Sequence, residues 1–175
     1  MKKRMNDKLK LILFSVLLLA GILITYSNHW HSDFHFDDAH TVQNNVYIQD
    51  INNIPLFYKD PKTFSSIPSH CSYRPLVTTT LAIDYYLGKG LNPFYFHLST
   101  FLLFLLQGVL MYFMFLKMFN AVSESTPNAF ISLFATALYM LHPTLAETVN
   151  YVISRSDTLS TLFVVMGIVT YQYSA

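Results

Sequence analysis

Two adjacent carboxylates, Asp37 and Asp38, lie in an aromatic segment that reads FHFDDAH at residues 34–40. Repulsion between neighbouring carboxylates and loss of hydration beside aromatic rings both raise the pKa of a carboxyl group toward the range of a general base. Such a base takes a proton from a hydroxyl group. A solvated loop that carries two acids is the alternative interpretation.

Histidines surround the acidic pair and suggest a possible metal site. Imidazole nitrogens and carboxylate oxygens are both metal ligands. The spacing of these histidines fits no standard metal motif, so we assign no metal and no cofactor, with a divalent ion as the weaker alternative. The histidines are His29, His31, His35 and His40.

Arg74 directly precedes Pro75, a residue suited to the first turn of a helix. A helix start favours anions, and a guanidinium can bind two phosphate oxygens at once. Arg74 is therefore a candidate phosphate ligand, or else a side chain that reaches lipid headgroups. Arg155 lies two residues before Asp157, which is expected to cap a following helix, so Arg155 is a second candidate.

A third polar segment covers residues 143–157. If it is one helix, Glu147, Tyr151 and Arg155 fall four residues apart and form a polar stripe. His142 stands just before this segment. Two arginines near a carboxylate pair suit one chemistry, the transfer of a group from a lipid phosphate to a hydroxyl, because the leaving phosphate needs positive charge.

The composition indicates the elements that must position these side chains. Of the 175 residues, 53% are hydrophobic and only 12% are charged, about half the ~25% of a soluble domain. Four uncharged runs approach or exceed the ~20 residues that cross a bilayer. These runs argue against a water-soluble enzyme. They are Leu11–Ser32, Leu91–Leu116, Ser125–Ala146 and Thr158–Ala175.

The basic residues predict how the chain crosses the membrane. Five of the eleven lysines and arginines lie in residues 1–10, and Lys117 falls in the next predicted inner loop. By the positive-inside rule the N-terminus is cytoplasmic. A cleavable signal peptide is the alternative, but the bulky residues 24–27 offer no cleavage site. The acids and arginines then share the outer side of the membrane.

We therefore predict an all-α, polytopic membrane protein with about four transmembrane helices and a long outer loop that carries an interfacial helix. The predicted segments are a basic cytoplasmic terminus at 1–10, spans at 11–30, 93–116, 128–142 and 158–175, outer loops at 31–92 and 143–157, and an inner loop at 117–127. A net charge of +1 without a basic stripe argues against nucleic acid. Cys71 is the only cysteine and has no internal disulfide partner.

The motif order resembles the transmembrane and tetratricopeptide-repeat-containing protein O-mannosyltransferases. The resemblance covers roughly residues 34–173. It rests on Phe36-Asp37-Asp38, Tyr73-Arg74-Pro75-Leu76, Asn92-Pro93-Phe94 with His97, Leu141-His142-Pro143 with Glu147, and Ser154-Arg155-Ser156-Asp157.

The resemblance implies the N-terminal part of a C-type glycosyltransferase fold. Such an enzyme moves a hexose, mannose by analogy, from a polyprenyl-phosphate lipid to a Ser or Thr hydroxyl of an acceptor protein outside the cytoplasm. It implies Asp37 as the base with Asp38 as its partner, and a bacterial inner or endoplasmic reticulum membrane. Arg74 and Arg155 would bind donor phosphate. His142 and Glu147 would shape the pocket.

Two departures from the family keep other functions open. The family has more spans followed by tetratricopeptide repeats, which predicts that this sequence is a piece of such an enzyme or a remnant of one. Relatives also carry a more basic residue where this chain has His40. A noncatalytic membrane subunit that binds a partner protein is the main alternative. A transporter is less favoured, because the apolar runs hold few ionisable residues.

Overall fold

The computed structural model describes residues 6–174, and its regular elements are all helical. The α-helices are α1 (Asp7–Thr25), α2 (Ile54–Phe57), α3 (Pro75–Leu87), α4 (Pro93–Val122), α5 (Pro127–Met140), α6 (Leu145–Asn150) and α7 (Arg155–Ser174). A π-helical turn covers Ala39–Gln43. Short 3₁₀ helices cover Ser27–His31, Val46–Gln49, Ile51–Asn53, Pro61–Phe64, Pro68–His70 and Val152–Ser154. Residues 1–5 of the predicted basic terminus lie outside the described residues.

Three helical segments are long and apolar enough to cross a membrane: Asp7–Thr25, Pro93–Val122 and Val152–Ser174. The predicted span at 128–142 forms α5, an apolar helix of only 14 residues. α4 continues to Val122 and thus takes up part of the predicted inner loop at 117–127. The fold is therefore an all-helical arrangement compatible with a polytopic membrane protein.

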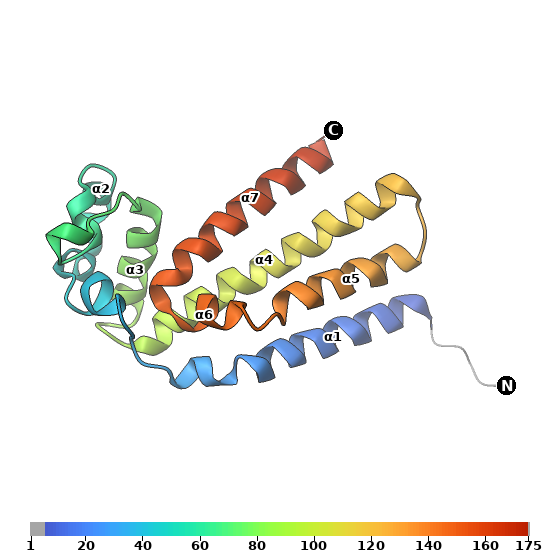
Figure 1. The fold of residues 1–175 in the computed structure, drawn as a ribbon, viewed down its shortest axis with the longest axis horizontal. Helices are drawn as coiled ribbons and strands as arrows, with labels where there is room; N and C mark the ends of the chain where they lie inside the picture. Colours follow the sequence, from blue (N-terminus) through green and yellow to red (C-terminus); the bar gives the residue numbers. More distant parts are fainter. Residues whose placement is uncertain (1–5, 175) are drawn as a thin grey trace.

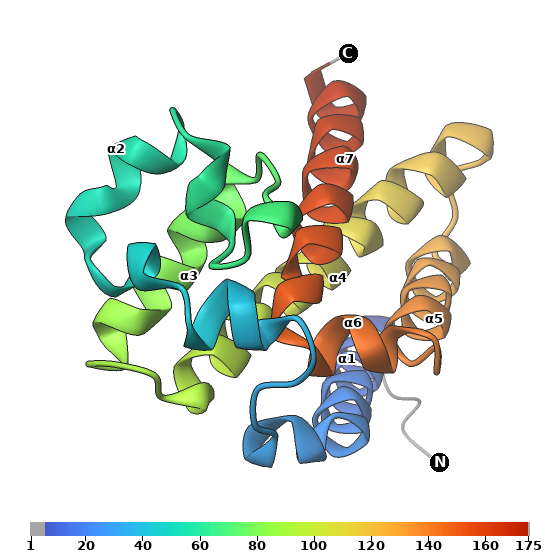
Figure 2. The ribbon, with the colours of Figure 1, turned by 60° about the vertical axis from the view of Figure 1, so that its left-hand side comes forward.

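The long helices lie beside one another, and the short elements gather at one end (Figure 1). α4 packs against both α5 and α7, while α1 packs against α5. In a view turned by 60°, α2, α3 and the neighbouring turns form a group of short elements to one side of α7 (Figure 2). The connections 26–92 and 141–154 lie at this end, which we call the cap, and the loop 123–126 lies at the other (Figure 1).

Two apolar clusters hold these parts together. In the bundle, Tyr26 is buried against Phe101 and Phe104, and its hydroxyl donates to the Met140 carbonyl at 3.0 Å. The cap has its own core of buried residues, which includes Val42, Ile48, Phe57, Leu81, Phe96 and Val152. Because residues from the first loop, α3, α4 and the segment before α7 share this core, it fixes the cap against the helix ends.

The segment 143–157 is not one helix, so the predicted polar stripe of Glu147, Tyr151 and Arg155 is wrong. α6 ends at Asn150, and Tyr151 is extended with φ −104° and ψ 116°. Because of this break, the side chains of Val152 and Ile153 are buried in the cap core. The Ile153 N–H is then free to donate to Asp38. A continuous helix would have used that N–H within the helix.

Candidate functional site

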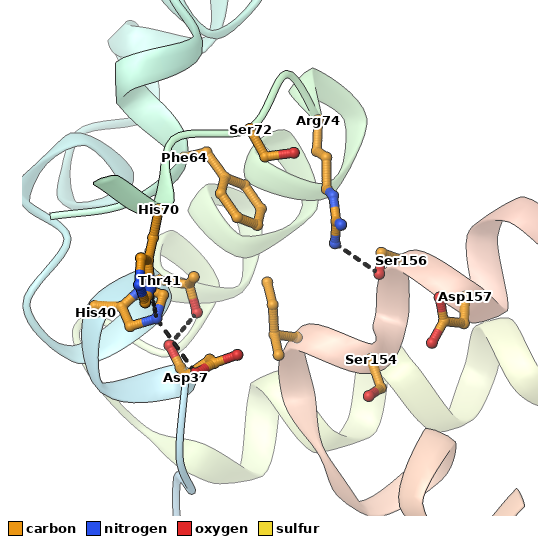
Figure 3. A pocket seen from close by; sticks show the side chains of 11 residues that line it. Asp37, His40, Thr41, Phe64, His70, Ser72, Arg74, Ser154, Ser156 and Asp157 are labelled. Atoms are coloured by element: carbon orange, nitrogen blue, oxygen red, sulfur yellow. Dashed lines mark hydrogen bonds and ion pairs between the residues drawn. The ribbon is translucent and has the colours of Figure 1, made fainter. Parts of the chain in front are cut away.

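A polar cavity of about 330 Å³ lies in the cap between the acidic turn, the segment before α3 and the start of α7 (Figure 3). Polar side chains from three separate parts of the chain supply most of its lining. The lining residues are Asp37, His40, Thr41, Phe64, His70, Ser72, Arg74, Ile153, Ser154, Ser156 and Asp157.

Asp37 presents its carboxylate to this cavity, with 64% of its side chain exposed. Its backbone is held firmly: the Asp37 N–H donates to the Tyr151 hydroxyl at 2.8 Å, and its carbonyl accepts from the Thr41 hydroxyl at 2.8 Å. Burial raises the pKa of Tyr151, which keeps this phenol neutral. The Asp37 carboxylate therefore projects from a rigid turn into an open polar space, as a general base requires.

Asp38 is completely buried and does not line the cavity. Its Oδ1 accepts from the Ile153 N–H at 2.9 Å, and its Oδ2 accepts from the His35 N–H at 3.1 Å. Burial raises the pKa of Asp38, while the backbone N–H donors oppose that shift. The structure thus separates the predicted pair: Asp37 faces the cavity, and Asp38 joins the first loop to the segment before α7.

Arg74 lies across the cavity from the acidic turn (Figure 3). It is the N-cap residue of α3, directly before Pro75. Its Nη1 donates to Ser156 Oγ at 3.2 Å, and the guanidinium lies 5.3 Å from the centre of the Phe64 ring. Its exposed side chain is available to an anion in the cavity.

Arg155 is completely buried and lies outside the cavity lining. Its Nη1 contacts Asp84 Oδ2 at 2.5 Å, its Nε donates to Thr100 Oγ1 at 3.0 Å and its Nη2 donates to the Phe96 carbonyl at 2.6 Å. Burial raises the pKa of Asp84, and the charge of Arg155 opposes that shift. The hydrogen bonds of Arg155 thus go to protein groups away from the cavity, and its contact with a donor phosphate stays a prediction.

His142 and Glu147 are exposed and also lie outside the cavity lining. His142 Nδ1 accepts from the Thr144 N–H at 3.3 Å, which fixes the turn before α6. The structure therefore does not bring His142 and Glu147 together with Asp37 and Arg74 in this cavity.

Several lining residues were not singled out from the sequence as site residues. Ser154 and Ser156 flank the buried Arg155. Asp157 lies in the first turn of α7 and not at the predicted N-cap position of the helix. The signal in the sequence that could have identified these three residues is the polar run that they form directly before an apolar span. His70 and Ser72 come from an irregular segment whose path the sequence did not indicate. No group of three or more His, Cys, Asp or Glu side chains that could hold a metal occurs among residues 6–174.

Three long apolar helices and a polar cavity at one end of them fit a membrane-embedded helical protein. No family model and no solved structure matches the chain. Several curated proteins do match the chain. Protein O-mannosyl-transferase TMTC4 of Mus musculus is 33% identical over 171 residues, which cover 90% of this chain and 23% of that protein. The Homo sapiens TMTC4 protein is 32% identical over 160 residues, covering 85% of this chain and 21% of that protein.

A more distant relative, protein O-mannosyl-transferase TMTC1 of Homo sapiens, is 29% identical over 166 residues, covering 91% of this chain and 18% of that protein. Over the matched segment the chain is therefore homologous to the TMTC protein O-mannosyl-transferases. It spans less than a quarter of the length of these relatives.

Proposed function

We propose that this chain supplies the acidic part of the active site of a membrane glycosyltransferase. The enzyme transfers a hexose, mannose by analogy with the relatives, from a polyprenyl-phosphate donor to a Ser or Thr hydroxyl of an acceptor protein. The reaction takes place on the extracytoplasmic side of the membrane, where the charge bias of the sequence directs the cap.

One observation carries the proposal: the Asp37 carboxylate and the Arg74 guanidinium line the same cavity from different walls (Figure 3). Glycosyl transfer to a hydroxyl needs a base on one side of the reacting carbon and positive charge near the leaving phosphate on the other. A cavity of about 330 Å³ with hydroxyl groups from Ser72, Ser154 and Ser156 has the size and polarity to take a sugar ring.

In the proposed reaction, Asp37 accepts the proton of the acceptor hydroxyl while that oxygen forms a bond to the anomeric carbon. The bond from the anomeric carbon to the phosphate oxygen breaks, and its electron pair leaves with the phosphate. Arg74 stabilises the negative charge that the phosphate gains. Asp38 has a structural part, because its oxygens are occupied by backbone donors.

The test compares Asp37→Asn with Asp33→Asn in membranes that express the chain in its full reading frame. Asp33 is an exposed acid of the same loop that does not line the cavity. Sugar transfer from a polyprenyl-phosphate hexose to a Ser- and Thr-containing peptide should fall ~10²- to 10⁴-fold in Asp37→Asn, the usual contribution of a general base. Asp33→Asn should keep wild-type transfer.

Equal transfer by both variants, at equal protein level, would remove Asp37 from the mechanism. Wild-type membranes without any transfer, combined with retained capture of a partner protein, would favour the noncatalytic membrane subunit instead.

A further inference from the structure

His40 contacts both the proposed base and the segment that precedes α3, through His70 (Figure 3). Its Nε2 lies 3.4 Å from Asp37 Oδ1 and 3.2 Å from His70 Nδ1, and its Nδ1 lies 3.0 Å from Ser65 Oγ. Its carbonyl accepts from the Ser66 N–H at 2.9 Å. One side chain thus joins the acidic turn to the segment that leads to Arg74.

We infer that His40 is a positioning residue that holds the Asp37 carboxylate in its reactive orientation, an inference that rests on the proposed function. The Asp37 backbone is already fixed by Tyr151 and Thr41. The carboxylate itself can still rotate, since 64% of the side chain is exposed. Among the described residues, two side chains interact with the Asp37 carboxylate: His40, at 3.4 Å, and Tyr151, through its hydroxyl.

The hydrogen positions follow from the partners of each ring nitrogen. An ionised carboxylate only accepts, so Nε2 of His40 carries the hydrogen that faces Asp37. In a neutral ring Nδ1 then accepts from the Ser65 hydroxyl. In a charged ring Nδ1 donates to Ser65 Oγ, whose own hydrogen can turn to the Ile67 carbonyl at 3.2 Å. In both charge states an N–H can stay on Nε2, which lies 3.2 Å from His70 Nδ1 and 3.4 Å from Asp37 Oδ1.

The 3.4 Å contact to Asp37 is an ion-pair distance, and the hydrogen bond of Nε2 is with His70 Nδ1 at 3.2 Å. The ring itself is well held, with only 12% of the side chain exposed. The π-helical turn Ala39–Gln43 sets this position along the backbone, and such turns often occur at functional sites. His40 therefore has a fixed location from which it limits the movement of an exposed carboxylate.

The experiment compares His40→Gln with His40→Asn, two neutral amides of different length. The Gln amide nitrogen reaches the place of Nε2, and the Asn amide nitrogen reaches only the place of Nδ1, beside Ser65. We expect His40→Gln to keep kcat within about threefold of wild type and His40→Asn to lose ~10- to 100-fold, the usual effect of misplacing a reacting group. The KM for the donor should stay within about twofold in both.

Equal kcat values for the Gln and Asn variants would overturn the inference, and so would a loss confined to the donor KM. Asp37→Asn separates this failure from that of the proposed function. If Asp37→Asn loses transfer while His40→Asn keeps it, His40 has no positioning role and Asp37 remains the base. If Asp37→Asn keeps transfer, both proposals are wrong.

Discussion

Arg155 and Asp84 form a buried ion pair with Nη1 and Oδ2 2.5 Å apart, which joins the start of α7 to the end of α3. Neighbouring polar groups support the pair: Ser99 Oγ donates to the same Asp84 oxygen at 2.7 Å, and Thr100 and the Phe96 carbonyl accept from Arg155. Because α3 follows Arg74 directly and α7 carries Ser156, this pair sets the distance between two walls of the cavity.

Breaking the pair from one side should be costly. Arg155→Met leaves the Asp84 carboxylate buried without its cation, and we expect it to destabilise the protein by ~3–5 kcal/mol. The double variant Arg155→Met with Asp84→Leu removes both charges and should recover much of that loss. Denaturant unfolding in detergent measures both. If Arg155→Met were as stable as wild type, the pair would have no structural role.

The same substitution at the two neighbouring acids should affect the stability of the protein at Asp38 but not at Asp37. Asp38→Asn places an NH₂ group opposite a backbone N–H that now donates to a carboxylate oxygen, so it should cost ~1–3 kcal/mol of stability. Asp37→Asn should leave stability unchanged, because that side chain is mostly exposed. Thermal unfolding of the two purified variants checks this contrast, and equal unfolding temperatures would contradict the burial of Asp38.

The pH dependence of stability should carry the signature of Asp38. Burial raises its pKa in the folded chain above the ordinary value of 3.8. The folded chain then binds this proton more tightly than the unfolded chain does, so the contribution of Asp38 to stability is fully present below the unfolded pKa. It is lost as the pH rises through the raised folded pKa.

Asp38→Asn cannot titrate at this position. Although less stable overall, it should lose less stability than wild type as the pH rises from about 3 through the window above the ordinary carboxyl pKa. Unfolding midpoints across that pH range give the comparison. Parallel curves for the two proteins would mean that the folded state does not raise the pKa of Asp38.

Arg74 should act on the donor and not on stability. Its side chain is exposed, and Arg74→Ala should reduce transfer ~10²-fold, the size expected when one charge-stabilising donor is lost. Arg74→Lys keeps the charge without the two-pronged geometry and should recover only part of the rate. Initial rates at several donor concentrations, with unfolding temperatures as the control, test this. Equal rates for Ala and wild type would exclude Arg74 from the site.

The local sequence indicated the helices but not which polar side chains would be buried. Long uncharged runs predicted the helical segments, because only a helix satisfies so many backbone groups without water. Asp37 and Asp38 are neighbours with the same chemistry, and only the contact between Asp38 and Ile153, 115 residues away, separates their roles. The burial of Arg155 likewise depends on Asp84, 71 residues earlier. Such long-range pairings leave no periodic signal in a single sequence.

The side of the membrane on which the cap lies can be tested with the chain's single cysteine. Cys71 is partly exposed in the segment that leads to Arg74. If the cap is extracytoplasmic, a membrane-impermeant maleimide added to intact cells or spheroplasts should label Cys71. The matched control is Cys71→Ser with Ser123→Cys, which moves the thiol to the exposed loop at the opposite end of the bundle. That variant should be labelled only after the membrane is permeabilised. The reverse pattern would place Asp37 and Arg74 in the cytoplasm, where the proposed extracytoplasmic transfer could not occur.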